Sequence, residues 1–190
     1  MEILILAVVI LPLLTALFLK VASKFLNELL TNFITINAAL LSVAVSFFMF
    51  VYLLLDKFEP IKFELFEWYP SPQIIFEFYL DGLSGVMMIL ISGLSLVIQL
   101  FSTSYMSKDE KYTKYFEYFN FFVFSMLLLV LSGNFLVMFF GWELVGFSSY
   151  LLISFWYEKN SAAKAGNKAF ILNRIGDFGF LIGLMMIINY

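Results

Sequence analysis

Six long apolar segments dominate the pattern of hydrophobic and polar positions along the chain. Short polar stretches separate most of them, and about 20 apolar residues in a helix suffice to cross the hydrocarbon core of a bilayer. The pattern therefore predicts an all-α integral membrane protein, in which residues 1–190 form a single transmembrane domain with no soluble domain. The six predicted spans are residues 2–19, 31–55, 81–104, 116–132, 134–157 and 163–189.

The connection between the second and third spans is long and has a different pattern. Partly alternating apolar and acidic residues occupy 62–69 and 74–79, on either side of a proline-rich turn. Such alternation predicts a β-hairpin. The favoured interpretation is a cap on the outer face of the bundle, and the alternative is a docking surface for a neighbouring subunit. Three of its aromatic residues suit the interfacial belt of a membrane protein: Trp68, Tyr69 and Tyr79.

The lysines are unevenly distributed between the two ends of the spans. Seven lie in the first, third and fifth connections, whereas two, Lys57 and Lys62, lie in the second. Basic residues are enriched in loops on the cytoplasmic or matrix side of a membrane. This distribution places the odd-numbered connections inside and both termini outside. The seven are Lys20, Lys24, Lys108, Lys111, Lys114, Lys159 and Lys164.

Composition narrows the chemistry that the chain can perform. The residues are 63% hydrophobic and 13% charged, against about 45–50% and about 25% in soluble domains. Cysteine and histidine are absent, which excludes disulfides, iron–sulfur clusters and His-ligated haem. The net charge is −3 and there is no basic stripe, so nucleic acid is not an expected partner. We therefore expect no redox centre in this chain.

Three charged residues lie deep inside the predicted spans. Glu143 lies near the middle of the fifth span, and Arg174 and Asp177 lie in the sixth. A carboxylate at bilayer depth costs about 2.5–3.5 kcal/mol on insertion scales, so it is rarely kept without a use. We favour a proton-binding role for Glu143. The alternative is a carboxyl group that only hydrogen-bonds neighbouring helices.

The other polar residues of these spans have more ordinary explanations beside functional ones. Arg174 and Asp177 are three positions apart on one helix, so they can pair, either for function or to lower the cost of insertion. Lys168 is mainly an anchor that reaches the inner interface, with a second possible role in feeding protons inward. The small-residue spacing from Gly179 to Gly183 predicts close helix contact.

Four short runs, taken together, form a more specific pattern. They are YLDGLS at 79–84, FSTSYM at 101–106, GWELVGFSSYLLI at 141–153 and KAFILNRIGD at 168–177. In this order they resemble the subunit 5 family of proton-pumping NADH:ubiquinone oxidoreductase, the distal antiporter-like subunit of respiratory complex I. The resemblance covers residues 75–190 well, and the first two spans by position and topology.

The resemblance implies a role in proton translocation. In this family the glutamate that matches Glu143 pairs with a lysine on a broken seventh helix, and later lysines continue a hydrated polar axis. Arg174, Asp177 and Lys168 would contribute to the same path. FMN, iron–sulfur clusters and quinone would belong to other subunits. The expected partners are the other membrane-arm subunits of complex I and membrane lipids.

The resemblance also implies a location. We expect the mitochondrial inner membrane, with both termini on the side of the intermembrane space, and the alternative is a bacterial plasma membrane. The 25 phenylalanines agree with the AT-rich coding of an organelle genome.

The sequence departs from the family in length, because it ends after the sixth helix, within the first of two inverted five-helix repeats. Half a repeat cannot form a path alone, so we expect a companion chain that carries the later helices of a split subunit 5, or else a fragment. Two alternative functions remain open. One is a subunit of a multisubunit cation/proton antiporter, and the other is a structural part of the membrane arm without a pumping role.

Overall fold

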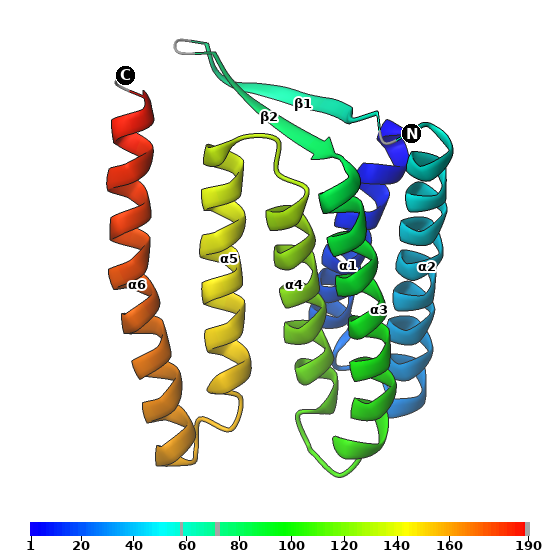
Figure 1. Cartoon of the computed structure of the whole chain (residues 1–190). Helices are drawn as coiled ribbons and strands as arrows, with labels where there is room; N and C mark the ends of the chain where they lie inside the picture. Colours follow the sequence, from blue (N-terminus) through cyan, green and yellow to red (C-terminus); the bar gives the residue numbers. More distant parts are fainter. Residues whose placement is uncertain (58, 71–72, 189–190) are drawn as a thin grey trace.

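The computed structural model describes residues 1–57, 59–70 and 73–188. Helices and a two-stranded hairpin follow one another along the chain (Figure 1). This arrangement confirms the predicted fold class. The elements are α1 (Glu2–Ala22), α2 (Glu28–Leu55), β1 (Ile61–Pro70), β2 (Gln73–Leu80), α3 (Gly82–Tyr105), α4 (Tyr112–Val130), α5 (Phe135–Ile153) and α6 (Asn160–Ile188).

Each predicted span coincides with a helix, but α4 differs from the others. Among the described residues, five helices are long and apolar enough to cross a membrane, and α4 is not one of them. It carries Lys114, Glu117 and Asn120 in its first half. Its main contacts are with α1 and α5, on either side of it. These neighbours shield α4 from lipid, so it needs less apolar surface than a helix at the edge of the bundle.

The packing order of the helices places α6 at one edge of the bundle. In addition to the contacts that α4 makes, the helices that pack against one another most are α2 with α3, α1 with α2, and α5 with α6. In Figure 1, α2 and α6 stand at opposite edges. A Cβ added at Gly176, Gly179 or Gly183 of α6 would meet no neighbouring atom of the described residues within 4 Å. The close helix contact predicted for Gly179 and Gly183 is therefore not made within this part of the chain.

The predicted β-hairpin is present and lies across one end of the helices. Its strands are antiparallel, with Phe63 opposite Phe78. Strand β2 is tied to the short connection between α4 and α5, since the Tyr79 amide donates to the Leu131 carbonyl (2.8 Å) and the Gly133 amide to the Glu77 carbonyl (2.9 Å). A Cβ at position 133 would lie 2.5 Å from Glu77 Cγ. Only glycine permits this approach, so the hairpin closes the bundle here.

Some of the predicted hairpin features lie outside the described residues. Ser71 and Pro72, at the tip of the turn, are among them, and so are the side chains of Trp68 and Tyr69. The third aromatic residue of the predicted belt, Tyr79, is described, and Lys62 Nζ lies 5.6 Å from the centre of its ring.

The opposite end of the bundle carries the lysine-bearing connections and will be called the lysine-rich end. Two of its connections are linked there. Lys111 Nζ lies 2.6 Å from Glu158 Oε1, and Trp156 Nε1 donates to Asp109 Oδ2 (2.7 Å). The hydrogen bond that Lys111 donates to the Glu158 carboxylate raises the pKa of the Lys111 ammonium above its usual value. The α3–α4 and α5–α6 connections are thereby held together.

We predict that Gly141→Ala destabilises the bundle. A Cβ at position 141 would lie 2.8 Å from Leu129 Cα, a backbone atom of α4, and overpacking of this kind costs about 1–3 kcal/mol. Thermal unfolding of the detergent-solubilised protein measures the effect. Gly93→Ala is the matched control, because no other atom lies within 4 Å of a Cβ there and alanine favours the helix. Equal losses of stability in the two variants would contradict close α4–α5 packing.

Candidate functional site

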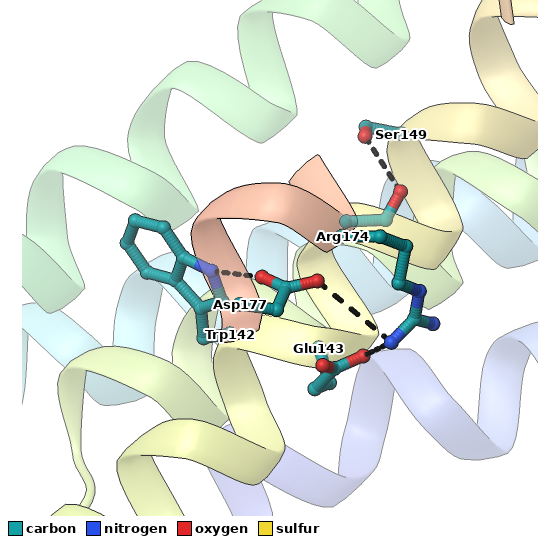
Figure 2. Close-up of polar contacts among 6 residues, drawn as sticks. Trp142, Glu143, Ser149, Arg174 and Asp177 are labelled. Atoms are coloured by element: carbon teal, nitrogen blue, oxygen red, sulfur yellow. Dashed lines mark hydrogen bonds and ion pairs between the residues drawn. The ribbon is translucent and has the colours of Figure 1, made fainter. Parts of the chain in front are cut away.

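Arg174 joins two carboxylates from neighbouring helices (Figure 2). Its Nη1 atom contacts Glu143 Oε2 of α5 and lies 3.7 Å from Asp177 Oδ2, three residues further along α6. The predicted neighbourhood of Arg174 and Asp177 is therefore present. The shorter contact, between Arg174 and Glu143, is one that the sequence alone does not assign. We call Glu143, Arg174, Asp177 and Trp142 the charged cluster.

Trp142 completes the charged cluster from α5. Its indole Nε1 donates to Asp177 Oδ1 (2.8 Å), and its ring stacks on Phe180 with centroids 6.3 Å apart. Asp177 is only 6% exposed, and its two oxygens face different partners. This role of Trp142 was missed from the sequence. The clue was that a tryptophan at membrane depth needs a partner for its N–H group.

The spacing of residues along α5 explains why the charged cluster forms at the contact with α6. Glu143, Gly146, Tyr150 and Ser154 recur every three or four positions, so they share one face of the helix. Small residues allow the two helices to approach: a Cβ at Gly146 would lie 3.5 Å from Asn173 Nδ2, and one at Gly166 would lie 2.8 Å from Ser154 Cβ.

Aromatic residues complete this contact. The Tyr150 ring lies 5.3 Å from the Phe170 ring, and the Arg174 guanidinium carbon lies 4.8 Å from the same Phe170 ring. The charged cluster lies near the middle of α5. The Tyr150–Phe170 contact flanks it on one side, and the stacked Trp142 and Phe180 rings flank it on the other.

The charged cluster has an electrostatic imbalance. Two carboxylates share one guanidinium, so the ionised cluster carries a net charge of −1. A charge left uncompensated at membrane depth is costly, and the imbalance is removed when a proton or a second cation binds. The Arg174 side chain is 47% exposed and that of Glu143 is 20% exposed. The charged cluster is thus accessible from the edge of the bundle that α6 forms.

Other polar residues of α5 and α6 lie outside the charged cluster. Lys168 is exposed and lies six residues before Arg174, which places it about 120° further around α6. Its role as an interface anchor stays a prediction. Ser148 and Ser149 donate to carbonyls of their own helix, at 2.8 and 2.9 Å, as expected for serine in a membrane helix. The described residues contain no group of acidic, histidine or cysteine side chains that suits a metal ion.

Two segments of the chain match known families. Residues 68–116 match the N-terminus of chain 5 of NADH-ubiquinone oxidoreductase (complex I). Residues 132–190 match the transmembrane region shared by NADH:quinone oxidoreductase and the Mrp antiporter. The second segment contains all four residues of the charged cluster.

Two relatives align with most of this chain. NADH-quinone oxidoreductase subunit L of Rickettsia bellii is 36% identical over 185 residues, which are 96% of this chain and 29% of the relative. The chloroplastic NAD(P)H-quinone oxidoreductase subunit 5 of Adiantum capillus-veneris is 40% identical over 148 residues, 76% of this chain and 20% of the relative. The chain therefore spans less than a third of the length of these relatives.

A solved structure shows the same fold. It belongs to the membrane-bound sulfane sulfur reductase, an archaeal respiratory membrane complex. The superposition has a TM-score of 0.83 at 22% identity and covers 96% of this chain and 36% of the other.

The matched transmembrane region and the relatives place this helical bundle in the antiporter-like class of membrane proteins. Within that class, the chain belongs to the complex I family of chain 5, also named subunit L. The family predicted from the four sequence runs is confirmed.

We predict that Trp142→Phe destabilises the protein by about 1–3 kcal/mol. The phenyl ring keeps an aromatic face toward Phe180, but Asp177 loses its neutral donor, and a hydrogen bond to a buried charged group contributes about this much. Thermal unfolding in detergent measures the change. Trp156→Phe is the control, since its bond to Asp109 is exposed and water can replace it. A loss as large in the control would show that burial of Asp177 does not matter.

Proposed function

We propose that this chain is part of the proton-translocating membrane domain of an NADH-quinone oxidoreductase, and that Glu143 binds the transported proton. The observation that carries the proposal is the sharing of one guanidinium by two carboxylates at the contact between two apolar helices, α5 and α6. A structural ion pair needs only one carboxylate for each cation. The additional carboxylate provides an alternative partner for Arg174.

The geometry supports a two-state mechanism. In the present arrangement Arg174 compensates the charge of Glu143. A movement of Arg174 toward Asp177, now 3.7 Å away, leaves Glu143 without a cation at membrane depth, where an ionised carboxylate is costly and binds a proton. Return of Arg174 favours release of that proton. Trp142 donates to Asp177 and so stabilises the carboxylate while Arg174 is elsewhere.

Further membrane helices, from a longer subunit or from a companion chain, are part of this proposal. The side of α6 away from α5 exposes large apolar residues, and the relatives are more than three times as long as the matched segment. Helices packed on this side would bring a second cation to the charged cluster and remove its net charge. The exposed residues include Ile171, Ile175, Phe178, Ile182 and Met186.

The proposal extends to cofactors, orientation and location. The chain has no cysteine or histidine to ligate an iron–sulfur cluster, so those clusters belong to other subunits, and the proposal assigns the flavin and the quinone site to other subunits as well. The lysine-rich end faces the matrix or cytoplasm, and the hairpin faces outward. The membrane is the mitochondrial inner membrane or a bacterial plasma membrane. The matched Mrp antiporter region favours cation/proton exchange as a second candidate function, and it would use the same charged cluster.

We predict that Glu143→Gln leaves the complex assembled but markedly lowers proton translocation per NADH oxidised. Glutamine keeps the size of the side chain and accepts a bond from Arg174, but it carries no titrating proton. Proton uptake by membrane vesicles during NADH oxidation measures the change. Glu117→Gln is the control, because Glu117 is a half-buried glutamate of α4 outside the charged cluster. Normal pumping by assembled Glu143→Gln complexes would show that Glu143 only holds helices together.

Variants of the ion-pair residues should differ in severity according to the charge that they leave. Arg174→Gln leaves two unpaired carboxylates and costs about 3–5 kcal/mol, so little assembled complex is expected. Asp177→Asn leaves a balanced Glu143–Arg174 pair and should assemble best. The Arg174→Gln/Asp177→Asn double variant leaves one unpaired carboxylate and should lie between them. Amounts of intact complex on native gels give the order. The opposite order would show that Arg174 does not compensate Glu143.

A further inference from the structure

The contact between α2 and α3 is lined by polar side chains, although both helices are strongly apolar. The residues recur at spacings of three, four or seven positions on each helix and are buried, so each set forms one face. We call these facing residues the α2–α3 seam. On α2 they are Thr31, Thr35, Ser42 and Ser46, and on α3 they are Ser92, Ser95, Gln99 and Ser102.

Most polar groups of the α2–α3 seam have hydrogen-bond partners. Thr35 and Ser95 donate to carbonyls of their own helices, at 2.9 and 2.7 Å. At the lysine-rich end, Thr31 bonds Thr113 (3.1 Å). Ser102 bonds the Tyr115 hydroxyl of α4 (3.0 Å). The seam is therefore continuous with a polar layer between α2, α3 and α4 at this end.

Three polar atoms in the middle of the α2–α3 seam are different. Ser42 Oγ, Ser46 Oγ and Gln99 Oε1 have no hydrogen-bond partner among the described residues, and the residues are 2%, 0% and 1% exposed. Buried polar groups are nearly always partnered, because burial removes their bonds to solvent. Serine in a helix commonly donates to the carbonyl four residues earlier, and neither Ser42 nor Ser46 does so.

The partner that these atoms require must be small, neutral and able both to donate and to accept. No charged residue belongs to the α2–α3 seam, which argues against an ion. The three atoms are already enclosed by this chain, so a neighbouring subunit on the outer surface would not reach them. Water meets each requirement, and buried waters typically bond about three otherwise unpartnered polar groups.

We propose that the α2–α3 seam is a binding site for internal water at Ser42, Ser46 and Gln99. The site is closed toward the hairpin by Met49, Leu53 and Met88, which are fully buried. A Cβ at Gly85 would lie 3.0 Å from Leu53 Cδ1, so the helices approach closely there. The site hydrates the bundle and is separate from the charged cluster.

Cryo-electron microscopy of the intact membrane complex tests the proposal directly. At a resolution that shows ordered water elsewhere in the membrane domain, density is expected within hydrogen-bond distance of Gln99 Oε1 and of at least one of the two serine hydroxyls. The Ser42→Ala/Ser46→Ala variant should lack the density beside those two positions. The proposal is overturned if the wild type shows no water density beside these residues and the Ser42 and Ser46 hydroxyls donate to carbonyls of their own helix.

Radiolytic hydroxyl labelling of the same complex gives a second readout that does not depend on pumping. Met49 and Met88 lie one turn from Ser46 and Ser92 and are fully buried, so labelling requires nearby bound water. The Ser42→Ala/Ser46→Ala variant is the matched control, because it removes the two unpartnered hydroxyls near Met49. Met49 and Met88 should be labelled in the wild type, and the variant should lose most of the label at Met49. Equal labelling of Met49 in the wild type and in the variant contradicts bound water at the two serines.

Discussion

The pairing of charges at membrane depth is the constraint on which the α5–α6 half of the structure depends. Arg174 is the only arginine of the chain, and it lies between two carboxylates on adjoining helices. An isolated charge in this position is expensive, so α5 and α6 must meet with the rotation that brings the three groups together. The small residues Gly146 and Gly166 permit that contact, and the Trp142 indole occupies the remaining side of Asp177.

The rigid part of the bundle supports this contact from the other side. Helix α4 lies between α1 and α5, and Gly141 brings α5 against the α4 backbone. The hairpin adds backbone hydrogen bonds to the α4–α5 connection, while Asn134 both caps α5 and donates to the Ile75 carbonyl. One end of α5 is thus fixed. The Glu143 side chain is presented from a fixed helix, whereas Arg174 is presented from the helix at the edge.

The sequence predicts the parts of this structure that depend on local pattern. Apolar length gives the helices, alternation gives the hairpin, and a spacing of three gives the neighbourhood of Arg174 and Asp177. Contacts between helices depend on their relative rotation, which a single sequence does not specify. For this reason the Glu143–Arg174 contact and the Trp142 donor emerge only in three dimensions. The α2–α3 seam was missed for a related reason, because serine and threonine barely lower the hydropathy of a long apolar run.

The two polar regions differ in charge, and this difference explains their places in the bundle. The polar groups of the α2–α3 seam are neutral. A few hydrogen bonds satisfy them, so the seam can be enclosed on all sides. The charged cluster has one carboxylate too many for its cation, and no rearrangement of its own residues removes the imbalance. Under the proposed function, it exchanges charge with something outside itself. Its position at the edge formed by α6, where Arg174 is half exposed, gives a proton or a neighbouring cation access to it. An enclosed charged cluster would be a static ion pair, whereas one at an edge can respond to its neighbours.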